Sequence, residues 1–413
     1  WFPQVMVEKH QMGSSGVRYF VPPNHDPIAL NIDAGIWNWS GIFGANMIKD
    51  MTDQGQAGVS RHYLFDDYWP GSTETCIWKN VIGFLTECAS AQYAKPVYVE
   101  PGELSVIGKG LAEYEKSINM PMPWKGGWWR LSDIVDYEIV STLSVIKTCS
   151  LHRENILAFR NELCVKEVEK GKGHYFVFPA GQHDRTAFAE LVNLLLDHGL
   201  EVRRLDSERV IDGRVYQEGS IVIPMAQPFR PFIKEVLERQ AYPERHYTPG
   251  GEMIKPYEVT SWSFPLCRGV SCVELTAEPA VLDGAVSEVS SPFRLFDGAG
   301  NQYSRVILPA SDNGSFRAAF RALELGLEVW RLNQEFNELA GKGSFYIDLS
   351  GAGREDTEAV ISELMAEPVI PESEPEMEKS RVKMPRIGLV ETWFHDMDAG
   401  WTRYLFDQYD IDY

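Results

Sequence analysis

Residues 199–205 (GLEVRRL) and residues 326–332 (GLEVWRL) are near copies of each other, and this repeat decides the fold. Each copy starts with Gly, the residue that most often follows the end of a helix, and continues as a strand. A proline-containing apolar stretch precedes each copy, at 178–180 (FPA) and at 308–310 (LPA). The sequence therefore predicts a strand, a helix and a second strand, twice over.

A third strand is predicted after each copy, at 219–223 (GSIVI) and at 343–347 (GSFYI). Strand-helix-strand units build parallel sheets that helices cover. We therefore expect the strands of each repeat to lie parallel to one another.

A further unit is predicted from a strand at 386–390 (RIGLV) and a helix near 400–403. Together these patterns indicate a doubly wound, flavodoxin-like α/β region over 174–413. Its strand-helix-strand units are expected at about 174–275 and 303–413.

The rest of the chain is predicted to hold a partial mixed-sheet domain at 1–130 and a helical connector at 131–173. Within the first of these, strands are predicted at 3–10 and 81–87, and a helix at 36–54 that ends at a glycine.

Residues 133–170 contain neither Gly nor Pro. Their apolar residues recur in steps of three and four, which predicts one long amphipathic helix or two in sequence: Ile139, Leu143, Ile146, Ile156, Phe159 and Leu163. Residues 367–378, with five Glu, three Pro and no basic residue, are predicted to be a solvated loop or linker.

The chain begins at Trp1 almost inside a predicted strand and ends at Tyr413 where another strand is expected. No basic segment or apolar core of a signal peptide precedes the first strand. We therefore expect an internal fragment of a longer protein.

The composition excludes several classes of partner. The formal charge is −20, from 39 Lys and Arg against 59 Asp and Glu, whereas nucleic acids and anionic membranes select a basic surface. No apolar run reaches the roughly 18–20 residues of a membrane helix. The six cysteines form no C-x-x-C pair, which excludes a zinc ribbon and a small disulfide scaffold.

His10 and Glu87 are the main candidates for chemistry. Each ends a predicted apolar strand and precedes small residues, 13–16 (GSSG) and 88–90 (CAS). Sites in α/β proteins collect at the carboxyl ends of strands. His10 could ligate a metal, and burial would raise the pKa of Glu87 toward that of a general base. The alternatives are a histidine held by loop backbone and a structural carboxylate.

Two further residues could line the same pocket. Tyr68, in the loop 66–72 (DDYWPGS), could donate a hydrogen bond to a substrate, or could simply pack against Trp69. Arg18, just after the His10 loop, could hold a carboxylate or could be an ordinary surface arginine.

The segments 10–16 (HQMGSSG), 18–23 (RYFVPP) and 83–87 (GFLTE) resemble the carboxypeptidase A-like zinc metallocarboxypeptidases, in particular large bacterial members with an appended α/β region. The resemblance implies that His10 is the third zinc ligand and that Glu87 activates the zinc-bound water. It implies a peptide or peptide-like amide as substrate, Zn²⁺ as cofactor and export to the periplasm or the medium. It covers residues 1–130 and, more loosely, the remainder.

The sequence departs from this family in its other ligands. No His-x-x-Glu motif, which supplies the first two zinc ligands of the family, precedes His10, and the arginines that bind the substrate carboxylate are also missing. Residues 198–201 (HGLE) are not the missing pair, because the histidine is expected to end a helix and Glu201 to belong to the next strand. The chain alone is therefore expected to be inactive.

The appended region resembles glutamine amidotransferase domains, whose nucleophilic Cys sits on a tight turn among glycines. No G-x-C-x-G or G-x-S-x-G occurs in this chain, so the region is expected to be non-catalytic. Two alternatives to a zinc peptidase stay open: a pseudo-peptidase that binds peptides or glycans without cutting them, and hydrolytic chemistry centred on the α/β region.

Overall fold

The computed structural model describes residues 3–68, 75–257, 261–298, 303–393 and 396–413. They form two compact units of mixed α/β structure: residues 1–174 with 224–263, and residues 175–223 with 264–413. The segment 224–263, which the sequence analysis grouped with the α/β region, thus packs with the first unit. No helix among the described residues is long and apolar enough to cross a membrane.

The first unit is built on a mixed sheet of order β1-β6-β2-β4. Its strands are β1 (Val5–Met12), β6 (Ile82–Ala89), β2 (Tyr19–Val21) and β4 (Val59–Arg61). The predicted strands at 3–10 and 81–87 are confirmed as β1 and β6. These two strands are parallel and in register over their full length, while β2 runs antiparallel to β6.

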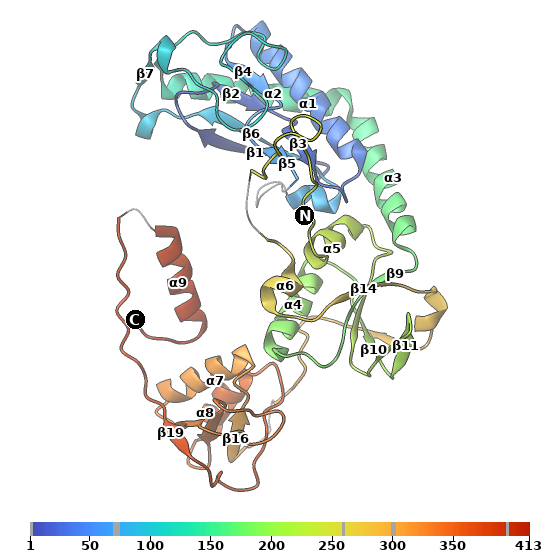
Figure 1. Ribbon diagram of the computed structural model, residues 1–413, viewed down its shortest axis with the longest axis vertical. Coiled ribbons are helices and arrows are strands. Elements are labelled where there is room, and N and C mark those ends of the chain that lie inside the picture. Colours follow the sequence, from blue (N-terminus) through green and yellow to red (C-terminus); the bar gives the residue numbers. More distant parts are fainter. Residues whose placement is uncertain (1–2, 69–74, 258–260, 299–302, 394–395) are drawn as a thin grey trace. The chain divides into compact units, whose positions relative to one another are not determined.

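Three long helices accompany this sheet: α1 (Ala34–Asp53), α2 (Leu131–Leu151) and α3 (Arg153–Gly171). The prediction of a helix at 36–54 is confirmed by α1, which starts at the N-cap Asp33 and is followed by Gly55 at φ 79°. Helices α1 and α2 pack side by side, and both contact β6 (Figure 1). Residues 131–173 therefore belong to the first unit.

Smaller elements complete the first unit. They are the pairs β3 (His25–Ile28) with β5 (Asp66–Asp67) and β7 (Val97–Val99) with β8 (Gly127–Trp129), the short 3-10 helices η1 (Thr75–Lys79), η2 (Gln92–Ala94) and η3 (Pro101–Glu103), and helix α5 (Arg230–Leu237).

The face that α2 buries is not the one that its apolar periodicity suggests. Ile139, Leu143 and Ile146 are all more than half exposed. The buried residues of the helix are instead Ile134, Tyr137, Ser141, Ser144 and Thr148. Small side chains at the last three positions allow the close approach of α1 and β6.

The second unit contains the two repeats. The first consists of β9 (His174–Phe178), α4 (Arg185–Asp197), β10 (Arg203–Leu205), the hairpin β11 (Arg209–Ile211) and β12 (Arg214–Tyr216), and β13 (Ile221–Pro224). The segments α6 (Phe264–Arg268), β14 (Val273–Thr276), η4 (Pro279–Leu282) and β15 (Val286–Glu288) follow. The strand order is β14-β9-β13-β10-β15.

The second repeat consists of β16 (Arg305–Leu308), α7 (Asn313–Glu324), β17 (Val329–Leu332) and β18 (Phe345–Asp348). The elements α8 (Arg354–Ser362), β19 (Lys379–Arg381) and α9 (Asp396–Gln408) follow. The strand order β16-β18-β17 matches the order β9-β13-β10 of the first repeat. The two repeats therefore share one arrangement as well as one sequence pattern.

The expectation of wholly parallel strands is wrong. Strand β18 is antiparallel to both β16 and β17, and β13 is antiparallel to β10. The chain between β17 and β18 contains no described helix, and the Gly343 amide donates back to the Leu332 carbonyl. Since parallel neighbours need a long crossover whereas a reversing loop joins antiparallel ones, the third strand inserts between the first two.

The strand and helix predicted after the two repeats are only partly present. Residues 386–390 form no strand, so that prediction is wrong. The helix predicted near 400–403 is confirmed as α9. Most of its apolar side chains, including Trp401 and Leu405, are exposed.

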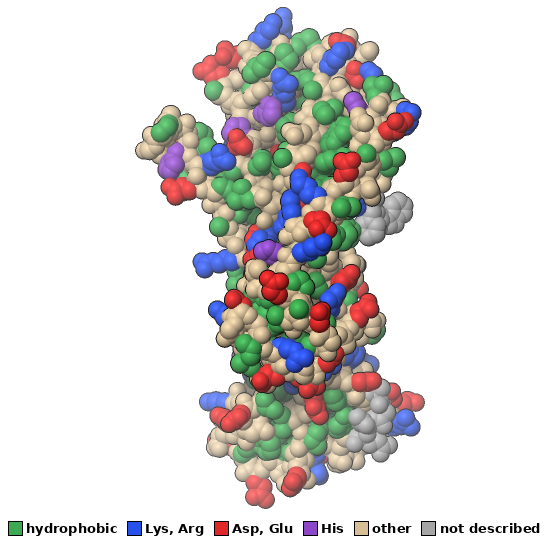
Figure 2. Space-filling view, turned by 90° about the vertical axis from the view of Figure 1, so that its right-hand side faces the viewer, with side chains coloured by type: hydrophobic (Ala, Val, Ile, Leu, Met, Phe, Trp, Pro, Cys, Tyr) green, Lys and Arg blue, Asp and Glu red, His purple; other side chains and the backbone are tan. Residues whose placement is uncertain are grey.

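Charges of both signs are mixed over the surface. On the face shown in Figure 2, Lys and Arg side chains lie next to Asp and Glu side chains. Exposed ion pairs such as Lys49–Asp53 and Lys172–Glu169 contribute at most about 1 kcal/mol each. These exposed pairs therefore contribute little to the stability of the fold.

Candidate functional site

The parallel register of β1 and β6 makes His10 and Glu87 direct neighbours. Their side chains lie on the same face of the sheet, with His10 Nδ1 3.8 Å from Glu87 Oε1. Glu8, two residues earlier on β1, also points to this face and places its Oε1 3.4 Å from His10 Nε2. One imidazole thus lies between two carboxylates near the carboxyl ends of two parallel strands.

Glu87 is the buried member of this group. Its side chain is 10% exposed, and its Oε2 atom has no hydrogen-bond partner among the described residues. Burial raises the pKa of Glu87 above its usual range, and the neighbouring His10 partly opposes this. A carboxylate with a free buried oxygen and a raised pKa is a better proton acceptor than an exposed one.

The opposite face of the same strands has a structural role. Lys9 and Thr86 point to that face, where Tyr19 donates to Thr86 Oγ1 at 3.0 Å. Lys9 forms an ion pair with Glu138 of α2 and donates to Ser141 Oγ at 2.7 Å. Because side chains alternate along a strand, this polar contact with α2 leaves His10 and Glu87 on the other face.

Arg18 is fully buried. Its Nη2 donates to the carbonyls of Ser14 and Gly16, and its guanidinium stacks on Trp124 and Trp129, 4.4 and 5.0 Å from the ring centroids. This arrangement fixes the loop that follows His10. The guanidinium is not open to a substrate carboxylate in this conformation.

Tyr68 lies among aromatic rings rather than beside His10. Its ring centroid is 4.9 Å from that of Tyr242 and 5.7 Å from that of Trp262. Burial, together with Glu235 and Glu238, raises its pKa to about 12. The predicted loop over the pocket includes residues 69–72, which lie outside the described residues. The predicted packing of Tyr68 on Trp69 therefore also lies outside them.

A second group of polar residues in the first unit was not found from the sequence. Asp67 is buried and accepts hydrogen bonds from the backbone and side-chain nitrogens of Asn24, at 3.1 and 2.5 Å. Burial, with Asp66 and Asp26 nearby, raises the pKa of Asp67. Asp67 and Asn24 line a cavity of about 390 Å³ together with His25 and His62 among others. The Asp-Asp dipeptide after an apolar stretch was the signal available in the sequence.

Glu8 was also missed, although the sequence contained its signal. Residues two apart on a strand share a face, so the carboxylate of Glu8 had to lie on the same face as His10. Among the described residues, His10 and its neighbours do not form a three-ligand metal group. His198 caps the end of α4, with Gly199 at φ 81°, as expected. The prediction that Glu201 belongs to the next strand is wrong, because β10 begins at Arg203.

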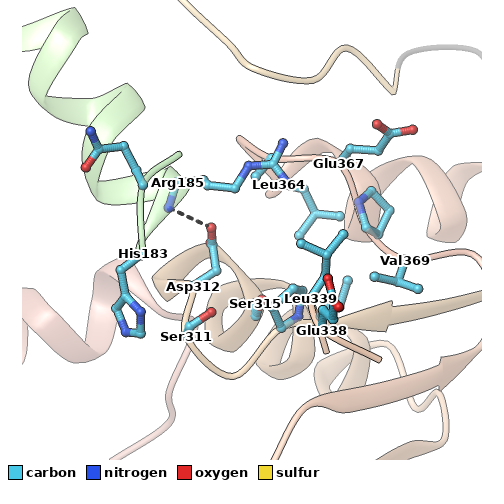
Figure 3. A pocket seen from close by; sticks show the side chains of 15 residues that line it. His183, Arg185, Ser311, Asp312, Ser315, Glu338, Leu339, Leu364, Glu367 and Val369 are labelled. Carbon is cyan, nitrogen blue, oxygen red and sulfur yellow. Dashed lines mark hydrogen bonds between the residues drawn. The ribbon is translucent and has the colours of Figure 1, made fainter. Parts of the chain in front are cut away.

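A second cavity, of about 220 Å³, lies within the second unit beside Asp312 (Figure 3). Comparison with known proteins adds no assignment for either unit, since no family model, curated protein or solved structure matches this chain.

Proposed function

We propose that this chain contributes to zinc-dependent hydrolysis of a peptide or amide bond, as in the carboxypeptidase A-like enzymes. The observation that supports this most is the pairing of His10 with Glu87. A histidine and a carboxylate with a free buried oxygen lie side by side near the carboxyl ends of two parallel strands. Buried polar atoms are usually hydrogen-bonded, so an unsatisfied carboxylate oxygen beside a histidine supports a role in chemistry.

His10 fits a zinc site as one ligand, because neutral imidazole is a common donor for this ion. Glu8, beside Nε2, can accept the single N–H of the neutral ring and hold it in place. This leaves Nδ1, the nitrogen that faces Glu87, to bind the ion. Bound zinc would lower the pKa of a water molecule and polarise the scissile carbonyl. Glu87 would then take a proton from the attacking water and pass it to the leaving amine.

The remaining two ligands in this proposal come from outside the described residues. The substrate carboxylate would likewise need a cation other than the buried Arg18. The second unit would be an amidotransferase-like domain without catalysis of its own. Export from the cell belongs to the same proposal and rests on the resemblance alone.

The test uses this chain within a longer protein that supplies the two remaining ligands, with added Zn²⁺ and N-acylated dipeptides as substrates. We expect Glu87→Gln to lower the rate by on the order of 10²-fold or more while zinc binding is kept. His10→Ala should weaken zinc binding itself. Glu138→Gln is the matched control and should retain activity. It alters a carboxylate of α2 that pairs with Lys9 on the opposite face of the sheet.

Three outcomes would count against hydrolysis at this site. Full activity in Glu87→Gln would remove Glu87 as the base. Activity that survives in His10→Ala would point to chemistry in the α/β region. Saturable peptide or glycan binding that requires His10, without turnover at any zinc concentration, would favour the non-catalytic binding module.

A further inference from the structure

The two repeats meet at the first turns of α4 and α7. Asp312, the N-cap of α7, accepts hydrogen bonds from the backbone amides of Arg185 and Thr186 in α4, both at 3.1 Å. In return, Asp184, the N-cap of α4, accepts from the Asn313 amide at 3.4 Å. These hydrogen bonds hold the first turn of α4 against the first turn of α7.

Gly314 makes this contact possible. A Cβ atom at position 314 would lie 2.5 Å from Thr186 Oγ1, closer than real Cβ atoms approach. Asp312 Oδ1 also accepts from Thr186 Oγ1 at 2.6 Å and from the Gly314 amide at 2.9 Å. The first amides of both helices are therefore occupied, and neither helix end is left to bind an anion.

The cavity beside Asp312 is small, and its wall is part polar and part apolar. Leu308 and Leu364 are buried in that wall, and Val369 is partly buried. Its volume of about 220 Å³ is below the roughly 300–1,000 Å³ typical of pockets for drug-sized ligands. A ligand of on the order of ten non-hydrogen atoms suits this space.

The charges around the cavity have both signs. The Arg185 side chain extends across it (Figure 3), and its guanidinium has no hydrogen bond or ion pair with a described residue. Glu338 and Glu367 are exposed at the rim and likewise form no ion pair among the described residues. Among the described residues, one unpaired cation and two unpaired carboxylates thus border a wall that is part polar and part apolar.

Comparison of the two repeats shows that the unpaired cation occurs in only one of them. Arg185 follows the N-cap Asp184, and the corresponding residue after the N-cap Asp312 is Asn313. The wall residue Leu308 corresponds to Phe178 at the end of the equivalent strand. The backbone contact is therefore duplicated, whereas the cation is present in only one copy.

We propose that this cavity binds a free α-amino acid with a medium-sized apolar side chain. The ligand carboxylate would pair with the Arg185 guanidinium, which suits bidentate contact. The ammonium group would pair with Glu338 or Glu367, and the side chain would lie against Leu339 and Val369, which are accessible apolar residues of the wall. A simple anion fits less well, because two carboxylates border the cavity. This site does not depend on the hydrolysis proposed for the first unit.

The test is calorimetric titration of the full chain with L-leucine in the presence of a metal chelator, so that the His10 site does not contribute. We expect saturable binding that Arg185→Gln weakens at least 10-fold, the effect of losing about 1.4 kcal/mol. Arg203→Gln is the matched control, because Arg203 lies on the surface of the same unit in a loose pair with Glu201. It should bind leucine as the wild type does.

Two analogues separate the contacts. N-acetyl-L-leucine lacks the ammonium group and leucinamide lacks the carboxylate, and both should bind at least 10-fold more weakly than leucine. Absence of saturable leucine binding, or equal binding by Arg185→Gln and wild type, would overturn the proposal. Binding of N-acetyl-L-leucine as tight as that of leucine would overturn the amino-acid assignment. Loss of hydrolysis in Glu87→Gln with leucine binding intact would show that the two proposals are separate.

Discussion

Asp312 in the second unit and Glu87 in the first are both buried carboxylates, and they differ in how they are satisfied. Asp312 accepts four hydrogen bonds, from two residues of α4 and from the start of its own helix. Glu87 faces a histidine at 3.8 Å and keeps one oxygen without a partner among the described residues. The first arrangement stabilises the fold, whereas the second leaves a buried oxygen that no described residue satisfies.

The largest effect is expected at Asp312. Asp312→Ala would leave four donors without this acceptor, three of them in buried hydrogen bonds, and we expect it to lower the free energy of unfolding by about 3 kcal/mol. Asp33→Ala is the comparison, because the described backbone donor to this N-cap is the Gly35 amide alone, and its other partners are the solvent-accessible Lys166 and Lys170, whose pairing contributes little. It should cost about 1 kcal/mol. Denaturant unfolding of both variants measures the difference, and equal losses would contradict the role given to Asp312.

Replacement of Glu87 should raise the free energy of unfolding rather than lower it. Its folded-state pKa is raised, so the folded state favours the protonated form. The stability it contributes is fully present below the unfolded pKa and is lost as the pH rises through the folded pKa. Glu87→Gln should therefore stabilise the fold at pH 7, because the amide stays neutral where Glu87 would carry a buried negative charge.

The pH dependence checks this sign. The difference in unfolding free energy between Glu87→Gln and wild type should grow from pH 4 toward pH 7 and then level off. A difference that shrinks over that range would mean that Glu87 is better satisfied in the folded chain than its contacts show. The stabilised variant should also be the inactive one, as is common for catalytic carboxylates.

The sequence predicted the elements better than their pairing. The repeated glycines and prolines mark where α4, α7 and the following strands begin and end. These signals are local, so they could be interpreted directly. The insertion of β18 between β16 and β17 depends on hydrogen bonds between residues far apart, which no local pattern encodes.

The candidate site shows the same limit. Strand ends placed His10 and Glu87 on two elements, and only the parallel register of β1 and β6 made them neighbours. The burial of Arg18 depends on Trp124 and Trp129, which lie more than a hundred residues later in the chain. Nothing near position 18 could have predicted that contact.

The smallest effect is expected where periodicity suggested a core. Leu143 belongs to the apolar series of α2, yet its side chain is 59% exposed. Leu143→Gln should therefore change the free energy of unfolding by no more than about 0.5 kcal/mol. Ser144, the next residue, is buried, and Ser144→Leu should cost about 1–3 kcal/mol because it overpacks a close helix contact. Denaturant unfolding of the pair decides which face of α2 is the packed one. A loss in Leu143→Gln as large as that in Ser144→Leu would mean that the apolar series is covered in solution.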